Sequence, residues 1–283
     1  MRILIADSGS TKTDWRALDG GKTVARADTQ GINPYHQDET AISTIVNGEM
    51  VPQIGDFVPD AIYFYGSGCR EERAHTVETP LRRAFPDSGV IEVRSDLLGA
   101  ARALCGDNEG IACIMGTGAN SCLYDGKEIA DNTPPLGYIL GDEGSGAALG
   151  KMFLNALYKG RLPKAVEEEF AQKSRMTLDA VLGRVYGEPL ANRFLASLSP
   201  FIHAHLDVAE IRDMARDNFR LHFRNNVSRY GRRDLRAGAV GSVAYYYADL
   251  LREAAKAEGY EMGGILRQPM DGLVAYHTKK CSF

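Results

Sequence analysis

Two apolar runs in this chain each end in a turn of glycine and hydroxyl residues, and this repeat constrains the fold most. The first run, residues 2–6, leads into Asp7-Ser-Gly-Ser-Thr-Lys-Thr13. The second, residues 111–115, leads into Gly116-Thr-Gly118. A polar hairpin signal with a glycine follows each turn along the chain. The sequence therefore predicts that a strand, a glycine-rich turn and a hairpin occur twice, in two similar lobes.

Helical and strand patterns alternate through much of the chain. Further apolar runs lie at 61–65, 90–93 and 237–240, and amphipathic stretches lie at 71–85 and 97–105. Strands that alternate with helices are typical of α/β proteins. We therefore expect an α/β fold whose two lobes each contain a mixed sheet covered by helices.

The same patterns suggest how the chain divides. Residues 1–106 are expected to form an N-terminal lobe, completed by a C-terminal helix at 270–283. Residues 107–269 are expected to form the second lobe, with a helical insert at about 155–230. One further helix is predicted over 242–258, ahead of a terminating glycine.

Charge and cysteine content exclude several classes of protein. The formal charge is −4, from 37 acidic and 33 basic residues that are well mixed, so no basic face for nucleic acid is expected. No apolar run reaches the roughly 18 residues of a membrane span, and the first residues are predicted to form a strand, so we expect no signal peptide. The five cysteines are odd in number and form no CxxC pair, which argues against disulfides and zinc. We expect a cytoplasmic protein.

Two familiar nucleotide motifs are incomplete in this sequence. Residues 144–152 resemble a P-loop, but the first required glycine falls on Ser145, and Met152 replaces the magnesium-binding hydroxyl. Residues 116–121 resemble a dinucleotide fingerprint without its third glycine. Neither motif predicts a site of its usual kind.

The two glycine-rich turns fit a different phosphate-binding device. Glycine lets the backbone approach a phosphate closely, and hydroxyl and N–H groups can bind anionic oxygens. Asp7, at the end of a buried strand, can hold magnesium directly or through water. Either turn alone could be a simple tight turn. The candidate phosphate-binding residues are Gly9, Ser10, Thr11, Lys12, Gly116, Thr117 and Gly118.

Six segments in this order resemble one known family. The pair of turns is similar to those of the actin, hexokinase and heat-shock-chaperone ATPase superfamily. Within it, the chain resembles the BadF/BadG/BcrA/BcrD ATPases, specifically the N-acetylglucosamine kinases. The resemblance covers almost the whole chain except residues 155–230, which we expect to differ freely. The segments are Asp7–Asp14, Gly31–Pro34, Ser95-Asp96, Gly116–Ser121, Leu140–Gly146 and Ala239–Ser242.

This resemblance implies a fold and an activity. It implies a ribonuclease H-like, actin-like fold with a nucleotide cleft between two lobes. ATP and Mg²⁺ are the implied cofactors, and a small-molecule sugar is the implied partner; a homodimer is left open. We expect an ATP-dependent sugar kinase whose substrate is an amino sugar. The expected reaction converts N-acetylglucosamine to its 6-phosphate. The alternatives are a glucosamine kinase and an ATPase that activates a radical dehydratase.

Asp96 is the candidate catalytic base. It follows the apolar run 90–93 and begins a predicted helix, which places it at the carboxyl end of a strand, where α/β proteins bind ligands. A kinase needs one carboxylate to orient the attacking hydroxyl and accept its proton. A helix N-cap is the simpler explanation of an aspartate here. The resemblance places the base at this residue.

Four residues are candidates for sugar binding. Asp142 and Glu143 stand at a predicted helix start, where acids also stabilise the helix dipole. Fixed carboxylates bind sugar hydroxyls well, and the resemblance places a sugar contact in this segment. Asn33 and Asn120 can donate and accept, which suits an amide-bearing sugar, although Asn33 before a proline could be a plain turn.

A last turn, at Gly241 and Ser242, resembles the family's nucleoside loop. Gly241 would let adenine or ribose lie against the backbone, although many strand-to-helix turns need glycine for geometry alone.

The dehydratase-activator alternative needs paired cysteines in and near the second phosphate loop. Cys113 lies inside the apolar strand, and no cysteine occurs between 123 and 280. The sequence therefore favours the kinase.

Overall fold

The computed structural model describes residues 1–9 and 11–280. The expected phosphate-binding Ser10 lies outside the described residues. The chain forms two compact units, which are described one at a time. Their bounds are Met1–Asn108, Asp125–Ile129 and Gln268–Phe283 for unit 1, and Glu109–Tyr124 and Ala130–Arg267 for unit 2.

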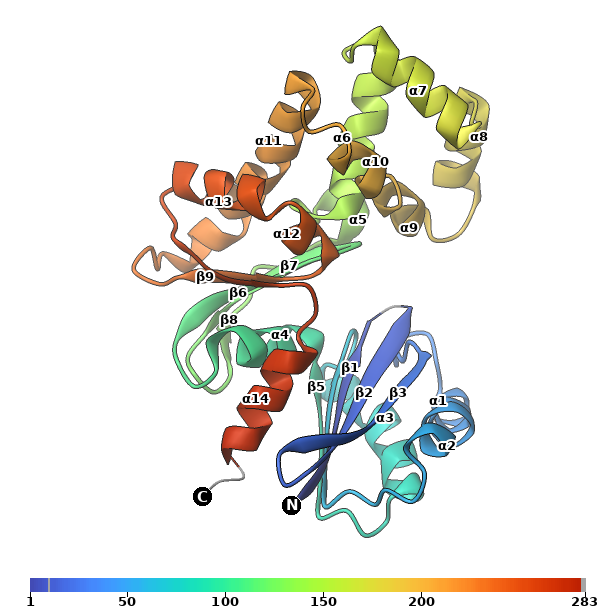
Figure 1. Ribbon diagram of the computed structural model, residues 1–283, viewed down its shortest axis with the longest axis vertical. Helices are drawn as coiled ribbons and strands as arrows, with labels where there is room; N and C mark the ends of the chain where they lie inside the picture. The colour runs from blue at the N-terminus through green and yellow to red at the C-terminus, as the bar shows by residue number, and fades with distance from the viewer. Residues whose placement is uncertain (10, 281–283) are drawn as a thin grey trace. The chain divides into compact units, whose positions relative to one another are not determined.

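Unit 1 is built on a mixed five-stranded sheet (Figure 1). Apolar residues alternate or run continuously in the central strands because both faces of the sheet are covered. β1 pairs antiparallel with β2 and parallel with β4, and β5 extends the parallel side. In spatial order the strands are β3 (Lys22–Gln30), β2 (Lys12–Asp19), β1 (Arg2–Ser8), β4 (Ala61–Gly66) and β5 (Val90–Ser95).

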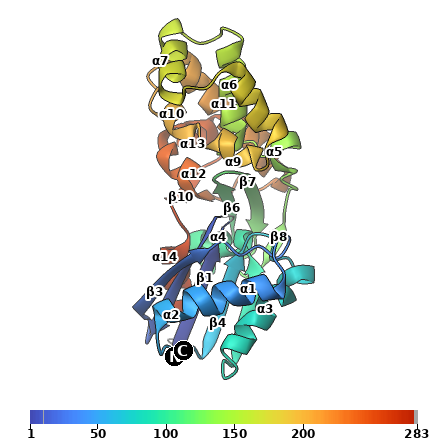
Figure 2. The same cartoon turned by 90° about the vertical axis from the view of Figure 1, so that its right-hand side faces the viewer.

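Alternating side chains of β1 point into two separate cores. Leu4 and Ala6 pack with the helices on one face, and Ile3 and Ile5 pack with Met270 on the other. Figure 2 looks onto the first group of helices, in front of the sheet. The first group is α1 (Glu39–Ile45), η1 (Val46–Met50), α2 (Val51–Ile54) and α3 (Glu71–Ala84). The second is α4 (Asp96–Cys105) and α14 (Met270–Lys280).

The second sheet repeats the order of the first. β6 pairs antiparallel with β7 and parallel with β9, as β1 pairs with β2 and β4, and β10 again extends the parallel side. The predicted fold class, α/β with two similar lobes of mixed sheets, is confirmed. In spatial order the strands are β10 (Met262–Leu266), β9 (Ala237–Val240), β6 (Gly110–Met115), β7 (Ala119–Tyr124) and β8 (Ile129–Asp131).

Helices of unit 2 form one large apolar core with β6 and β9 (Figure 1). α6 packs against α9 and α11, and α11 packs against α13. The helices are α5 (Gly137–Leu140), α6 (Gly146–Tyr158), α7 (Lys164–Ser174), α8 (Leu178–Leu182), η2 (Gly183–Gly187), α9 (Ala191–Ala196), α10 (Ser199–His203), α11 (Ala209–Asn225), η3 (Val227–Tyr230), α12 (Ser242–Tyr246) and α13 (Ala248–Ala257).

Two local expectations differ from the structure. The helix predicted over 242–258 is broken at Tyr247, whose backbone (φ −100°, ψ 24°) leaves the helical range. The side chain of this tyrosine is buried, and its hydroxyl donates to the carbonyl of Ser199. β10 was not predicted, because two adjacent glycines weaken its strand pattern. None of the described helices has the length and apolar character that a membrane span requires.

Candidate active site

Asp7 lies in unit 1 among other carboxylates. It is the partner of Asp14 in the β1–β2 register, so the two acids stand opposite each other on one face of the sheet. Burial, then the charges of Asp96 and Asp14, raise the pKa of Asp7 to about 7. Ionising all the carboxylates of this site at neutral pH is therefore energetically unfavourable.

Asp96 is the first residue of α4, and Ser95 is the N-cap. The Ser95 hydroxyl accepts the N–H of Leu98, so the helix does not need Asp96 as its cap. The Asp96 carboxylate instead accepts the N–H of Leu97 at 2.9 Å and the Ser67 hydroxyl. Burial raises its pKa, although these hydrogen bonds counteract the rise. A carboxylate poised in this way suits proton acceptance.

The turn after β4 completes this group, and the sequence analysis missed it. Its residues Gly66-Ser67-Gly68 follow an apolar strand, as the two phosphate-loop candidates do. Because β4 is parallel to β1, the turn lies at the same sheet edge as Asp7, and the Ser67 N–H donates to the Ser8 carbonyl at 3.0 Å. Arg70, just beyond, lowers the pKa of Asp96.

The β1–β2 turn itself is open. The Gly9 N–H bonds the Lys12 carbonyl at 3.0 Å, and the nearest atom to an added Cβ at Gly9 would be 3.8 Å away. Thr11 and Lys12 are exposed, and Lys12 forms a surface ion pair with Asp28. Space is therefore available beside Gly9, as close approach of a phosphate requires.

Asn33 forms the turn that the sequence allowed. Its Oδ1 accepts the N–H of Tyr35 at 2.9 Å, and its backbone N–H is bound by the Gln37 side chain. A Cβ at Gly68 would come within 2.5 Å of the same Oδ1. Asn33 thus packs on the turn that carries Ser67, near Asp96.

In unit 2, the β6–β7 turn is held by the start of α6. The N–H groups of Gly146 and Ala147 donate to the carbonyls of Gly116 and Thr117, at 2.8 and 3.1 Å. These donors at the α6 N-terminus are therefore used inside the protein. The Gly116 N–H bonds the Gly118 carbonyl, which closes the turn.

Asp142 covers this turn. Its Oδ2 would lie 3.0 Å from a Cβ at Gly118, and its carboxylate accepts the N–H of Ala119. Burial raises its pKa to about 6, opposed by that hydrogen bond and by Lys151. Its φ of 59° is left-handed, a strained conformation that often marks functional sites.

The other two candidates for sugar binding already have protein partners. Burial would raise the pKa of Glu143, but hydrogen bonds from Asn225 and Asn226 bring it below its ordinary value. The Oδ1 of Asn120 accepts the N–H of Ser121 and the amide of Asn132. Asp142 is held differently, because its carboxylate accepts a backbone N–H, that of Ala119, rather than a side-chain amide.

The remaining predicted loop, at Gly241, packs against the β6–β7 turn. A Cβ there would lie 2.2 Å from the Met115 carbonyl oxygen and 3.3 Å from the Gly116 nitrogen, and its φ is 128°. Only glycine fits such a contact. Ser242 follows as the first residue of α12. Unit 2 therefore brings together the second glycine turn, Asp142 and the Gly241 loop.

The carboxylates of unit 1 fit a magnesium ion. Mg²⁺ is usually bound by one or two carboxylates together with water and substrate phosphates. A cation at Asp7 would relieve the repulsion from Asp96 and Asp14 that raises its pKa. The residues on this sheet edge are therefore of the right kind for the metal.

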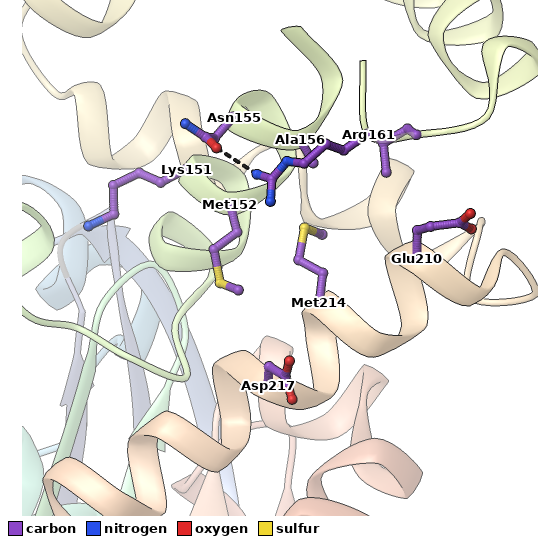
Figure 3. Close-up of a pocket in the computed structure, with 9 residues that line it drawn as sticks. Lys151, Met152, Asn155, Ala156, Arg161, Glu210, Met214 and Asp217 are labelled. Atoms are coloured by element: carbon purple, nitrogen blue, oxygen red, sulfur yellow. Dashed lines mark hydrogen bonds between the residues drawn. The ribbon is translucent and has the colours of Figure 1, made fainter. Parts of the chain in front are cut away.

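A separate pocket of about 590 Å³ lies in unit 2, between α6 and α11 (Figure 3). None of its lining residues was predicted from the sequence as a site residue. Lys151 lies at its edge and donates to the carbonyl of Tyr138. Lys151 belongs to the incomplete P-loop motif and was therefore not predicted as a site residue. Its positive charge nevertheless acts to lower the pKa of Asp142.

Comparison with solved structures gives a match over the full chain. A Porphyromonas gingivalis protein assigned as an N-acetylglucosamine kinase is 47% identical, with a TM-score of 0.95 and 99% of each chain covered. A Chromobacterium violaceum protein with the same assignment is 18% identical, with a TM-score of 0.68 and coverage of 97% of this chain and 98% of that one.

More distant structures share the fold alone. A Streptomyces griseus ROK-family glucokinase, solved with glucose and AMPPNP, is 14% identical, with a TM-score of 0.59 and 98% of each chain covered. No protein-family model and no curated protein matches the chain.

Proposed function

We propose that this chain, which belongs to the BadF/BadG/BcrA/BcrD ATPase family and is similar to N-acetylglucosamine kinases, is an ATP-dependent sugar kinase acting on an amino sugar. The observation that carries the proposal is the placement of Asp7 and Asp96 at one sheet edge. One carboxylate suited to a metal beside one suited to a proton is the pair that phosphoryl transfer to an alcohol needs.

Asp96 is proposed as the base. In transfer to a sugar hydroxyl, the oxygen attacks the γ-phosphorus, the bond to the leaving ADP oxygen breaks, and the hydroxyl proton must be accepted. The Leu97 N–H and the Ser67 hydroxyl hold the Asp96 carboxylate in one orientation. Burial raises its pKa, which strengthens it as a proton acceptor.

ATP and Mg²⁺ are the proposed cofactors. Asp7 would hold the metal, whose charge offsets that of the phosphates. The proposed contacts to nucleotide are made by Gly9, Ser10, Thr11, Lys12, Gly116, Thr117, Gly118, Gly241 and Ser242. The open surroundings of Gly9 and the glycine-only contact at Gly241 support these assignments.

N-acetylglucosamine, phosphorylated at its 6-hydroxyl, is the proposed substrate. The 47% identity to the Porphyromonas gingivalis protein supports it. Asp142 is the proposed acceptor for sugar hydroxyls, with Asn33, Asn120 and Glu143 as further sugar-site residues. The dehydratase-activator alternative gains no support, because Cys113 and Cys122 are buried.

A cytoplasmic location is also proposed. The four cysteines that the structure describes, Cys69, Cys105, Cys113 and Cys122, are thiols that take part in no disulfide, which suits a reducing compartment. A homodimer remains a proposal that a sedimentation experiment can decide.

A coupled assay of ADP release tests the function. We expect release to require both Mg²⁺ and an amino sugar, with N-acetylglucosamine preferred over glucosamine, N-acetylmannosamine and glucose. Phosphorus NMR of the product would identify the esterified hydroxyl. Equal ATP turnover without any sugar would contradict the kinase and favour an ATPase.

A further inference from the structure

The segment that carries Asp142 has an unusual backbone. Asp142 has a φ of 59° and Gly144 a φ of 88°, so two of three successive residues are left-handed. A conformation of this kind persists only where the surrounding structure holds it. The Asp142 backbone contributes two contacts of its own, to the Pro135 carbonyl and from the Ser145 N–H.

One face of α11 holds the rest of the segment. Asn218 and His222 are four residues apart and therefore project from the same side of the helix. The Asn218 Oδ1 accepts the Gly144 N–H at 3.0 Å, and its Nδ2 donates to the Ser145 carbonyl at 3.3 Å. His222 Nδ1 donates to the Glu143 carbonyl at 2.8 Å.

The same face extends to the Glu143 side chain. Asn225 and Asn226, one helical turn beyond His222, donate to its two carboxylate oxygens at 2.7 and 3.5 Å. Backbone and side-chain groups of the segment are therefore bound by residues of α11 and by its C-cap, Asn226.

His222 makes this contact at a cost in protein stability. It is 1% exposed, burial lowers its pKa to about 4, and no described residue pairs with its Nε2. An unpaired buried nitrogen destabilises a protein, so an apolar residue would suit packing alone better. A Cβ at Gly144 would also lie 3.0 Å from the His222 Cβ, so glycine is needed for this close approach.

We propose that Asn218 and His222 are positioning residues, which fix the Glu143–Ser145 backbone and thereby aim the Asp142 carboxylate at the sugar. This inference rests on the proposed sugar-kinase function. It also gives a role to the helical insert expected at about 155–230, because α11 supplies contacts that hold the Glu143–Ser145 segment.

Sugar KM tests the inference first. Losing the bonds to Gly144 and Ser145 should let Asp142 move, so Asn218→Ala should raise the KM for N-acetylglucosamine about tenfold or more and leave the KM for ATP unchanged. In an Asp142→Asn background the same change should have no further effect on sugar KM, since the group it positions is already lost.

Two matched variants of α11 control for general damage. Asp217, the neighbouring residue, faces the α6–α11 pocket and forms a long surface ion pair with Arg220, so Asp217→Ala should leave sugar KM unchanged (Figure 3). Phe219→Leu should lower the melting temperature through the apolar core and also leave sugar KM unchanged.

A conservative pair tests the histidine. Asparagine can place an N–H where His222 Nδ1 lies, so His222→Asn should keep sugar KM close to wild type, whereas His222→Leu should raise it as Asn218→Ala does. A role in packing alone predicts the reverse result for sugar KM, with His222→Leu close to wild type and His222→Asn raised. The reason is that leucine removes the unpaired Nε2 and packs better.

Amide hydrogen exchange separates this inference from the proposed function. The Gly144 N–H should exchange faster in Asn218→Ala than in wild type or Asp217→Ala, with no substrate present. A wild-type protein that phosphorylates no sugar would defeat the proposed function. An active wild type with unchanged sugar KM and Gly144 exchange in Asn218→Ala would overturn the positioning role alone.

Discussion

The β1–β2 turn and the β6–β7 turn occupy equivalent places in two sheets of the same order, yet they are stabilised in different ways. Around Gly9 there is room for a further atom, and the nearby groups are carboxylates that repel one another. Gly118 is covered by Asp142, and Gly241 packs on the strand end at Met115. Like charges therefore surround the first turn, whereas the second is closely packed at Gly118, although Gly116 beside it is open.

This difference suggests a division of work between the two copies. A turn with repelling carboxylates gains stability when a cation and a substrate arrive. A turn packed by α6, Asp142 and the Gly241 loop is already rigid and can define the shape of a binding surface. Changes of charge should therefore affect the first turn most, and changes of volume the second.

The largest effect is expected from Asp96→Asn. Asparagine keeps the shape of the side chain but accepts a proton poorly, so turnover should fall by about 10²–10⁴-fold. Ser95 caps α4, so the melting temperature should hardly change. The measurements are coupled ADP release and thermal unfolding of the same preparation. Turnover near wild type would falsify the role of Asp96 and move the base to another carboxylate.

A Cβ added at Gly9, in the first turn, and at Gly241, which packs against the second turn from the β9–α12 loop, compares the packing of the two places. At Gly241 it would meet the Met115 carbonyl at 2.2 Å, so Gly241→Ala should destabilise the protein by about 2–3 kcal/mol. At Gly9 the nearest atom is 3.8 Å away, so Gly9→Ala should leave unfolding by urea almost unchanged. Equal losses in the two variants would remove the distinction between the turns.

The smallest effect is a shift of stability with pH at Asp7. The folded-state pKa is raised from 3.8 to about 7, so the folded protein binds this proton more tightly than the unfolded chain does. Its contribution to stability therefore falls as pH rises from about 4 to about 7. Asp7→Asn removes the penalty and should melt a few degrees higher than wild type at pH 8, with little difference near pH 4.

Magnesium provides the check on this last comparison. At pH 8 it should raise the melting temperature of wild type and not of Asp7→Asn, because the ion stabilises only the form that binds it. A difference in melting temperature between the two proteins that stays constant across the whole pH range would show that Asp7 does not have the raised pKa.

Repeating local patterns made the fold class predictable. Continuous apolar runs identified β1, β4, β6 and β9, and glycine turns after two of them indicated a duplicated plan. Elements without such a pattern were missed. β10 contains adjacent glycines, and Tyr247, where the helix breaks, is buried and bonded to Ser199, which is distant in sequence.

The site was predictable where residues lie next to one another in the chain. Asp7 and Asp14 share the β1–β2 hairpin, so the spacing of the first turn already implied their pairing. The contacts of Ser67 with Asp96 and of α11 with Glu143 depend on chain packing over long separations. The Gly66-Ser67-Gly68 turn could have been found, since it repeats the signal used elsewhere. The α11 contacts carry no local signal.

The packing of α14 has a consequence for how the protein is made. Met270 and Leu273 fill the core formed by Ile3 and Ile5, and His277 bonds the Tyr65 hydroxyl at 2.9 Å. Synthesis runs from the N-terminal to the C-terminal side, so one face of the first sheet stays without these partners until residues 270–277 have been made. Unit 2, whose core comes from residues 111–260, can complete its packing sooner. Unit 1, whose sheet is translated before unit 2, is therefore the later of the two units to finish folding.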